Sequence, residues 1–435
     1  SKNKERRGNL TERELRWMRL DNAAKIYPAA RRRMWNCLFR LSATLNEKID
    51  TAVMQNALDV TVKRFPSIAV RIRRGVFWYY LEELCTAPLI KSEAAYPMAR
   101  MSFKDVRKCA FRVVCYENRL AVEFYHALTD GNGGIIFLKT LLAEYLSQKY
   151  GVNIPFEKGV LDRTEKPKTK ELEDSFLKNY GPQSSSRKES TAYKLRGTLE
   201  NDGYLNLVTG VLDSSEILSL ARQYKVSLTA FLTAAMVYSI IQIQNRTTPK
   251  RKRQKPVKVL VPVNLRRIFD SITLRNFALY ITPGVDPRLG DYTFEEIVKS
   301  IHHQMGYEIN AKNLAAKIAA NVGAERSLIL KIMPLFIKNI AMKTAFNLFG
   351  ERKSSITISN LGVIDVPEEM KSYVNRFDFI LGEQAMCKNA CSVLSYNGKL
   401  YISFLRTVRE SEVEREFFCF LRSLGVKIKV ESNKR

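Results

Sequence analysis

Histidine is scarce in this 435-residue chain, which has only His126, His302 and His303. Three patterns of large enzyme classes are absent: the Gly-x-Ser-x-Gly of serine hydrolases, the P-loop of nucleotide hydrolases and the glycine pattern of Rossmann domains. His302 and His303 are adjacent in a predicted helix, so their rings point in different directions, and we expect both to be structural. A mechanism that uses histidine therefore depends on His126.

Disulfide and zinc signatures are also absent. The seven cysteines are odd in number and include no Cys-x-x-Cys pair, and Cys387 and Cys391 have no histidine near them in the sequence. These features predict reduced, mostly buried thiols, no metal site and a cytoplasmic protein. The polar and basic N-terminus does not resemble a signal peptide.

A long uninterrupted apolar run is missing. The longest apolar stretch, residues 328–349, is broken by Lys331, Pro334, Lys338 and Lys343. The interruptions predict a pair of basic amphipathic helices rather than a membrane span. Such helices can pack on the protein surface, cover the mouth of a tunnel or lie on a membrane.

Acidic residues are in deficit: 44 stand against 71 lysines and arginines, which gives a net charge of +27. This charge suits an anionic partner, and the candidates are a nucleotide-bearing cofactor, an acidic carrier protein, an anionic membrane face or nucleic acid. Solubility alone is an equal explanation. Seven of the basic residues lie in a predicted loop, residues 246–258, without the interleaved aromatic side chains that base stacking uses. The sequence therefore disfavours a nucleic-acid partner.

Residues 119–134 are the most informative stretch of the chain. They begin with the alternation of a strand and continue with His126, Asp130 four residues later, and glycines at positions 131, 133 and 134. An apolar run with helical spacing follows. This order predicts a strand, a histidine at its end, a tight glycine-rich turn and a helix to about residue 150.

The same plan occurs twice. Residues 116–120 match residues 396–400 at an offset of 280, and this offset sets Phe124 on Phe404 but His126 on Arg406. The second half therefore keeps the hairpin and helix and lacks the histidine.

A polar segment with proline, glycine and serine separates the two halves. The predicted organisation is an N-terminal half over residues 1–157, a crossover linker over 158–203 with a short helix at 171–179, and a C-terminal half over 204–435. Strands are expected over residues 34–41, 68–72, 76–81, 110–115, 120–125, 205–212, 257–263, 277–282, 356–359, 390–396 and 400–405. Helices are expected over residues 49–65, 214–224, 227–243, 294–313, 315–349 and 412–424.

His126-x-x-x-Asp130-Gly131 resembles the His-x-x-x-Asp-Gly signature of the chloramphenicol-acetyltransferase-like superfamily. Two further segments resemble family motifs: Asn264-Leu265-Arg266 at a strand end, and Ser359-Asn360-Leu361-Gly362 after another strand. Together with residues 20–28 they look most like bacterial alcohol acetyltransferase-like proteins. Peptide-synthetase condensation domains are related, but they usually carry two consecutive histidines, and Tyr125 precedes His126 here. The resemblance implies an α/β fold of two tandem chloramphenicol-acetyltransferase-like sandwich halves with an active-site tunnel between them.

The resemblance also implies roles for the motif residues. His126 is the expected general base, with Asp130 and Gly131 in the same motif. Asp130 is expected to turn away from the histidine and to pair with Arg266, or with Arg267 as the alternative. The oxyanion donors and channel lining are expected among the residues Gly134, Asn264, Ser359 and Asn360.

A neutral imidazole suits this chemistry, because transfer of an acyl group from a thioester requires deprotonation of the attacking hydroxyl or amine. The sequence predicts an acyltransferase that uses acyl-CoA as co-substrate, with no permanently bound cofactor. The donor's phosphates are expected to contact the basic residues Lys250, Arg251, Lys252 and Arg253. A carrier-protein-dependent condensation-type transferase and a non-catalytic basic binding protein are the alternatives, and a peripheral contact with an anionic membrane is a further expected partner interaction.

Overall fold

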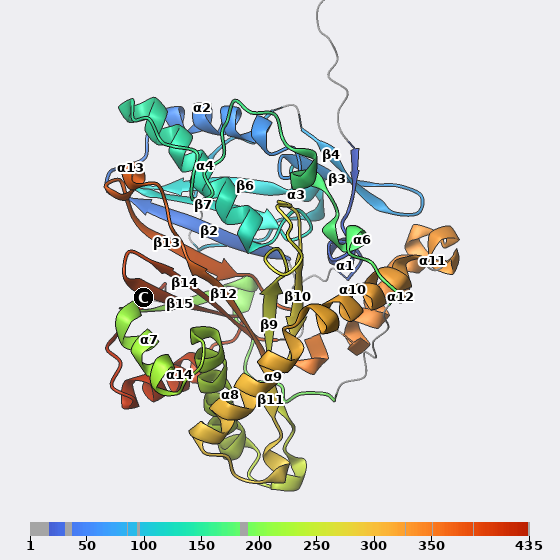
Figure 1. Ribbon diagram of the computed structural model, residues 1–435, viewed down its shortest axis with the longest axis vertical. Helices are drawn as coiled ribbons and strands as arrows, with labels where there is room; N and C mark the ends of the chain where they lie inside the picture. The colour runs from blue at the N-terminus through green and yellow to red at the C-terminus, as the bar shows by residue number, and fades with distance from the viewer. Residues whose placement is uncertain are drawn as a thin grey trace, which may run out of the picture.

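The computed structural model describes residues 17–30, 37–84, 86–93, 96–182, 190–326, 328–349, 351–385 and 387–433. The basic segment before residue 17, Cys85 and the start of the strand predicted over 34–41 lie outside these residues. Figure 1 shows two α/β halves, one above the other, with α10–α12 at one side.

The first half is built on a five-stranded sheet in the order β13-β2-β7-β6-β5. Its strands are β13 (Val374–Leu381), β2 (Leu38–Leu45), β7 (Arg119–Tyr125), β6 (Phe111–Tyr116) and β5 (Lys91–Ser92). Helices α2 (Thr51–Thr61) and α4 (Gly131–Tyr150) cover one face of this sheet (Figure 1). A small separate sheet in the order β1-β4-β3 contains β1 (Trp17–Arg19), β4 (Tyr79–Glu83) and β3 (Val70–Arg74).

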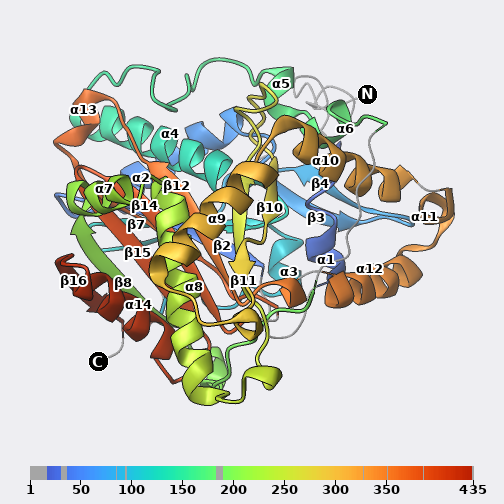
Figure 2. The same cartoon turned by 60° about the horizontal axis from the view of Figure 1, so that its bottom comes forward.

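The second half is built on an eight-stranded sheet in the order β10-β9-β12-β14-β15-β8-β16, with β11 paired to β9. Its strands are β10 (Ala278–Ile281), β9 (Val257–Asn264), β12 (Ile356–Val363), β14 (Asn389–Tyr396), β15 (Lys399–Arg406), β8 (Asn206–Asp213), β16 (Ile428–Ser432) and β11 (Gly284–Val285). Helices α7 (Ser214–Gln223), α8 (Leu228–Thr247), α9 (Phe294–Glu308) and α14 (Glu412–Ser423) cover one face, as Figure 2 shows. Parallel pairing of β12 with both β9 and β14 places the ends of β9 and β12 at the same sheet edge.

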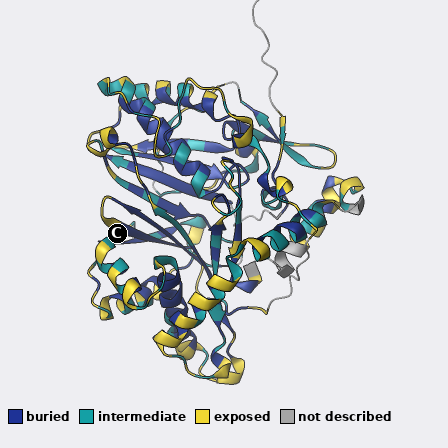
Figure 3. Ribbon diagram, viewed as in Figure 1, coloured by how far each residue is buried: buried dark blue, intermediate teal, exposed yellow. Residues whose placement is uncertain are grey.

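The remaining helices are shorter or lie at the side of the molecule. They are α1 (Ile26–Ala30), α3 (Phe103–Val106), α5 (Thr169–Leu172), α6 (Ser175–Lys178), α10 (Ala311–Arg326), α11 (Leu328–Ile332), α12 (Leu335–Phe349) and α13 (Glu368–Lys371). Figure 3 shows that the buried residues concentrate in the two sheets and on the helix faces that cover them. Within the described residues no single helix is long and apolar enough to cross a bilayer, and the one bent pair that passes on length and composition is α7 with α8, at 82°.

The repeat seen in the sequence corresponds to the β6–β7 hairpin with α4 and the β14–β15 hairpin with α14. Glu117 and Asn397 hold equivalent places in the two turns, and both adopt left-handed backbone with φ of 50° and 47°. The helix pair expected over 328–349 is present as α11 and α12, and Pro334 lies between them because it lacks the backbone N–H that helix continuation requires. The helical stretch expected from residue 315 begins earlier, with α10 from Ala311.

The strand β13 was not among the predicted elements. It lies beyond β12 in the chain, yet it pairs antiparallel with β2 at the edge of the first sheet. The apolar core of the first half therefore takes in Phe377, Phe379 and Leu381 from the C-terminal part of the chain. The two halves are thus joined by a shared sheet as well as by the linker.

Candidate active site

His126 follows the last residue of β7 directly. Its backbone N–H donates to the carbonyl of Cys37 at 2.8 Å, which ties the residue to the start of the neighbouring strand β2. The imidazole stacks on Tyr27 of α1 with ring centroids 4.8 Å apart and an interplanar angle of 13°. Phe39 approaches at 5.0 Å and 58°. The ring is therefore held by aromatic neighbours on separate elements.

The environment of His126 favours the neutral imidazole. Burial lowers the pKa of His126 below its ordinary value, and the residue's own backbone, the Asp130 charge and the Asn276 side chain oppose this shift. Its Nδ1 is buried and makes no hydrogen bond of ordinary geometry with the described residues. The ring as a whole is only half-buried, so Nε2 is the nitrogen left to meet a substrate.

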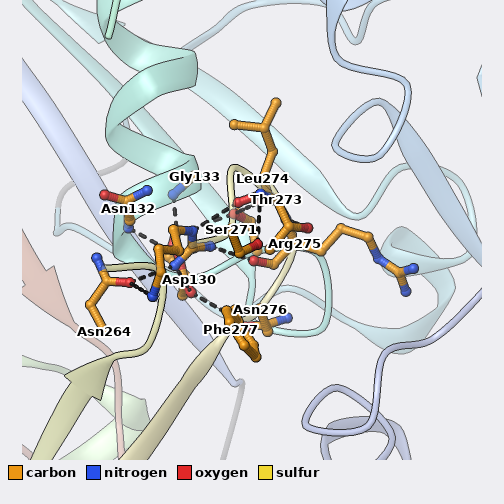
Figure 4. A network of polar contacts seen from close by, with 12 residues as sticks. Asp130, Asn132, Gly133, Asn264, Ser271, Thr273, Leu274, Arg275, Asn276 and Phe277 are labelled. Carbon is orange, nitrogen blue, oxygen red and sulfur yellow. Dashed lines mark hydrogen bonds and ion pairs between the residues drawn. The ribbon is translucent and has the colours of Figure 1, made fainter. Parts of the chain in front are cut away.

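Asp130 forms a bidentate ion pair with Arg266, with Nη1–Oδ2 and Nη2–Oδ1 distances of 2.8 and 3.0 Å. Its carboxylate also caps α4, because Oδ1 accepts from the backbone N–H groups of Asn132 and Gly133 at 3.1 and 3.2 Å. The backbone N–H of Phe277 donates to Oδ2 at 2.9 Å. Figure 4 shows these contacts converging on the carboxylate. Both charged side chains are buried, so Asp130 is committed to this network rather than to the histidine.

The loop between β9 and β10 supplies further hydrogen-bond acceptors to the guanidinium of Arg266 (Figure 4). Its Nε donates to the carbonyl of Thr273 at 2.8 Å, and its Nη2 donates to the carbonyl of Arg275 at 2.6 Å. Its Nη1 also donates to Asn264 Oδ1 at 3.1 Å. Arg267 is exposed and is not the partner of Asp130. Asn264 thus orients Arg266 through its amide oxygen.

The glycines after Asp130 form the first turn of α4, not the separate turn that the sequence predicted. The N–H of Gly134 donates to the carbonyl of Asp130 at 2.9 Å. Because the N–H groups of Asn132, Gly133 and Gly134 all have acceptors in this turn, Gly134 is not a free oxyanion donor. The turn excludes side chains: a Cβ on Gly133 would lie 2.1 Å from Thr129 Oγ1 and 2.2 Å from the carbonyl oxygen of Leu274.

The end of β12 meets the motif from the second half. A Cβ on Gly131 would lie 2.5 Å from Leu361 Cδ2, so the two motif segments are in contact. Asn360 is engaged locally, since its Nδ2 donates to Thr229 Oγ1 at 3.1 Å and its Oδ1 accepts from the N–H of Gly362 at 2.8 Å. The half-buried Ser359 hydroxyl makes no hydrogen bond within the described part of the chain. Of the expected channel residues, Ser359 and Asn264 keep an uncommitted donor within the described residues, the hydroxyl of Ser359 and the Nδ2 of Asn264.

Sequence reasoning missed a polar group behind the histidine. Asp21 is fully buried and accepts from the N–H of Ala24 at 2.7 Å and from Asn276 Nδ2 at 3.3 Å. Arg275 Nε lies 3.9 Å from its Oδ2. Burial raises the pKa of Asp21 to about 6, and the Arg275 charge opposes the shift. Asn276 thus connects this carboxyl to the surroundings of His126, and no local sequence pattern marks residues that meet across about 250 positions.

A buried carboxyl at the end of β13 is a second missed group. Glu383 is buried, its Oε2 has no hydrogen-bond partner within the described residues, and burial raises its pKa to about 7. The preceding Gly382 packs so closely on β2 that a Cβ there would lie 2.0 Å from the carbonyl oxygen of Leu38. Leu38 follows Cys37, the acceptor of the His126 N–H, so Glu383 stands near the same end of the sheet.

The expected donor-phosphate residues lie away from this site. Lys250, Arg251, Lys252 and Arg253 are exposed beside the start of β9, at the bottom of Figure 1, whereas Arg266 follows the end of β9. Eight residues of strand span about 25 Å, so the loop is remote from Asp130. A cavity of about 590 Å³ between the halves is lined by Arg119 at the start of β7, at the other end of that strand from His126. The tunnel expected at His126 stays a prediction.

The fold is shared with several solved structures. The chain is similar to the starter condensation domain of rhizomide synthetase in complex with C8-CoA, with a TM-score of 0.62, 13% identity and coverage of 94% of each chain. It is similar to polyketide synthase associated protein 5 from Mycobacterium tuberculosis, with a TM-score of 0.57, 13% identity and coverage of 94% and 97%. It is also similar to Fusarium sporotrichioides TRI101 complexed with Coenzyme A and T-2, with a TM-score of 0.58, 12% identity and coverage of 94% and 99%.

These likenesses extend over almost the whole of both chains and establish a two-lobed α/β fold, as expected from the sequence. No protein-family model matches the sequence. No curated protein matches it either.

Proposed function

We propose that this chain is an acyltransferase that moves an acyl group from acyl-CoA to a hydroxyl or amine acceptor, with His126 as general base. The observation that carries the proposal is the environment of His126. Its imidazole is half-buried, its pKa is lowered by burial, and its Nδ1 is buried. Such a group is neutral near pH 7 and has one nitrogen available to accept a proton.

In the proposed reaction, His126 takes the acceptor's proton as the acceptor oxygen or nitrogen attacks the thioester carbonyl. The tetrahedral intermediate then collapses, the carbon–sulfur bond breaks, and the imidazolium returns the proton to the leaving thiolate. The hydroxyl of Ser359 is our candidate donor to the oxyanion, because it is uncommitted and projects from the strand whose end contacts Gly131. Asp130 and Arg266 act by holding the first turn of α4 in place.

Two features support an acyl-CoA donor. Tyr125 stands where condensation domains usually carry a second histidine. Among the similar structures, TRI101 is described with Coenzyme A, and the rhizomide starter domain is described with C8-CoA. A carrier-protein-bound acyl group presents the same thioester, so this donor is the second candidate and is compared directly in the test.

The test is acceptor-dependent thiol release by the full chain, measured with a panel of acyl-CoA donors, acyl carrier proteins, alcohols and amines. We expect His126→Ala to lower kcat/KM by about 10²–10⁴-fold while the unfolding midpoint stays close to that of the wild type. His303→Ala is the matched control, because that histidine is exposed on α9, and it should retain full activity. Equal turnover by folded His126→Ala and the wild type would overturn the assignment.

A further inference from the structure

The outward side of α11 and α12 is apolar. Phe336, Ile337 and Ile340 of α12 are 59%, 42% and 66% exposed, and their spacing places them along one side of that helix. Ile332, the last residue of α11, is 73% exposed. The opposite side of α12 is buried through Leu335.

The tip of the β3–β4 hairpin extends this apolar surface with exposed Val76 and Phe77. The N–H of Leu335 donates to the carbonyl of Val76 at 3.1 Å, and Lys338 Nζ donates to the carbonyl of Phe77 at 2.8 Å. Lys338 Nζ also lies 3.5 Å from the centroid of the Trp78 ring. The helix is therefore fixed to the hairpin. We call the resulting surface the apolar ridge; its members are Val76, Phe77, Ile332, Phe336, Ile337 and Ile340.

The ridge has a basic rim and little acid near it. Arg74, Lys331 and Lys343 are exposed around it, and residues 328–349 contain no aspartate or glutamate. Glu325, at the end of α10, is only 19% exposed in its side chain and is paired with Lys25. Exposed aliphatic and aromatic side chains bordered by lysine and arginine are typical of surfaces that lie in the interface of an anionic membrane.

We propose that the apolar ridge and its basic rim dock on an anionic lipid bilayer. The apolar side chains would enter the boundary between headgroups and acyl chains, and Arg74, Lys331 and Lys343 would meet the lipid phosphates. A second copy of the chain is a poorer occupant, because it would bring basic rim against basic rim in a molecule of net charge +27. The proposal goes beyond acyl transfer and does not depend on it.

The ridge lies close to the candidate active site through one helix. α12 packs against α1, and Tyr27 of α1 stacks on the ring of His126. Docking through the ridge would therefore set α1, and with it one wall of the His126 environment, next to the membrane surface.

The first experiment is co-sedimentation of the full chain with vesicles of phosphatidylcholine alone or mixed with phosphatidylserine, at low and moderate salt. We expect binding to the anionic vesicles that weakens with salt. Replacing the rim by Arg74→Gln, Lys331→Gln and Lys343→Gln should weaken this binding about 100-fold, since each basic residue near an anionic surface contributes about a factor of five. Phe336→Gln with Ile340→Gln should remove the part of the binding that survives moderate salt.

Two control variants match these changes at other places. Lys250→Gln, Lys252→Gln and Arg253→Gln remove the same charge from the loop before β9, and Leu89→Gln with Leu289→Gln replaces equally exposed apolar residues. Both controls should bind vesicles like the wild type. Absence of binding to anionic vesicles, or equal losses in the controls, would overturn the proposal. A dimer in sedimentation velocity that Phe336→Gln dissolves would assign the ridge to a second copy and would also overturn it.

Discussion

At the scale of single residues, the ring that stacks on His126 contributes to the burial that lowers the pKa of this imidazole. Tyr27 covers one face of the ring with centroids 4.8 Å apart, and burial is the main reason that the pKa of His126 lies below its ordinary value. A protonated imidazole cannot accept a proton from the acceptor. Activity should therefore be lost as pH falls through the pKa of His126, at a pH below the ordinary histidine value of about 6.5.

Tyr27→Ala tests this dependence, because it admits water to one face of the ring. The pKa of His126 should rise toward its ordinary value, so the acid limb of kcat/KM should move to higher pH by about one unit. Tyr116→Ala changes an exposed tyrosine at the other end of the β6–β7 hairpin and serves as the control, with no shift expected. An acid limb that stays in place in Tyr27→Ala would show that the stacked ring does not set the charge state.

Residues that meet only after folding were beyond the reach of sequence reasoning. The motif identified His126 and Asp130 in the sequence because they lie four residues apart, and a strand-end pattern identified Arg266. Asp21 and Asn276 lie far apart in the sequence, and the hydrogen bond between them forms only when the chain folds. Their chemistry comes from burial, which a local pattern does not report.

At the scale of secondary structure elements, the ion pair of Asp130 with Arg266 joins the start of α4 to the loop between β9 and β10. We expect Asp130→Asn to cost about 3–5 kcal/mol of unfolding free energy, because it leaves a buried guanidinium without its counter-charge. Arg266→Met combined with Asp130→Asn should cost less than the sum of the single changes, with a coupling of about 1–3 kcal/mol. Urea unfolding of the four proteins measures this coupling.

A surface ion pair provides the comparison for that cycle. Asp286 and Arg288 are partly exposed and only two residues apart, with an Nη2–Oδ2 distance of 2.5 Å. Removing either should change the unfolding free energy by about 1 kcal/mol or less. Strictly additive losses of unfolding free energy at Asp130 and Arg266 would argue that their ion pair does not join α4 to the loop between β9 and β10. Equal losses of unfolding free energy at this pair and at the Asp286–Arg288 pair would argue the same.

Several elements with a clear hydrophobic periodicity were predicted well, whereas the strand β13 was not predicted. The hairpin over 111–125 and the helix after it follow simple alternation and helical spacing. In β13, Arg376, Phe377, Asp378 and Phe379 alternate between charged and apolar side chains, which is the period of a half-buried strand, so the sequence carried a signal that the prediction missed. The side chains of Arg376 and Asp378 lie on one face of the strand and pair with each other at 2.7 Å. What a local pattern does not report is the partner of this strand, because β13 pairs with β2 from the other end of the chain.

At the scale of the whole molecule, the shared sheet should make the two halves unfold together. The three tryptophans, at positions 17, 35 and 78, all belong to the N-terminal part of the chain, and the described core of the second half contains no tryptophan. Phe404 is buried in the second core, against Phe417 and Phe418. Phe404→Ala should cost about 3–5 kcal/mol and should lower the midpoint of the tryptophan signal by the same amount as that of circular dichroism.

A variant in the first core gives the reciprocal check. Phe124→Ala removes a buried ring from the first half and should shift the two signals equally as well. Tryptophan fluorescence that keeps its wild-type midpoint in Phe404→Ala would mean that the halves unfold separately.

The place of β13 also has a consequence for synthesis of the chain. β2 is largely buried on both faces, one with Phe39, Leu41, Ala43 and Leu45 and the other with Arg40, Ser42 and Thr44, and β13 covers the edge that β7 leaves open. The ribosome completes β13 about 250 residues after β7, which at 5–20 residues per second is a delay of roughly 13–50 s. During that interval the nascent first half presents an unpaired strand edge with one apolar face, a feature that readily recruits another chain. Yield of folded protein should therefore depend on how quickly translation reaches residue 381 and on chaperones that shield β2 until it does.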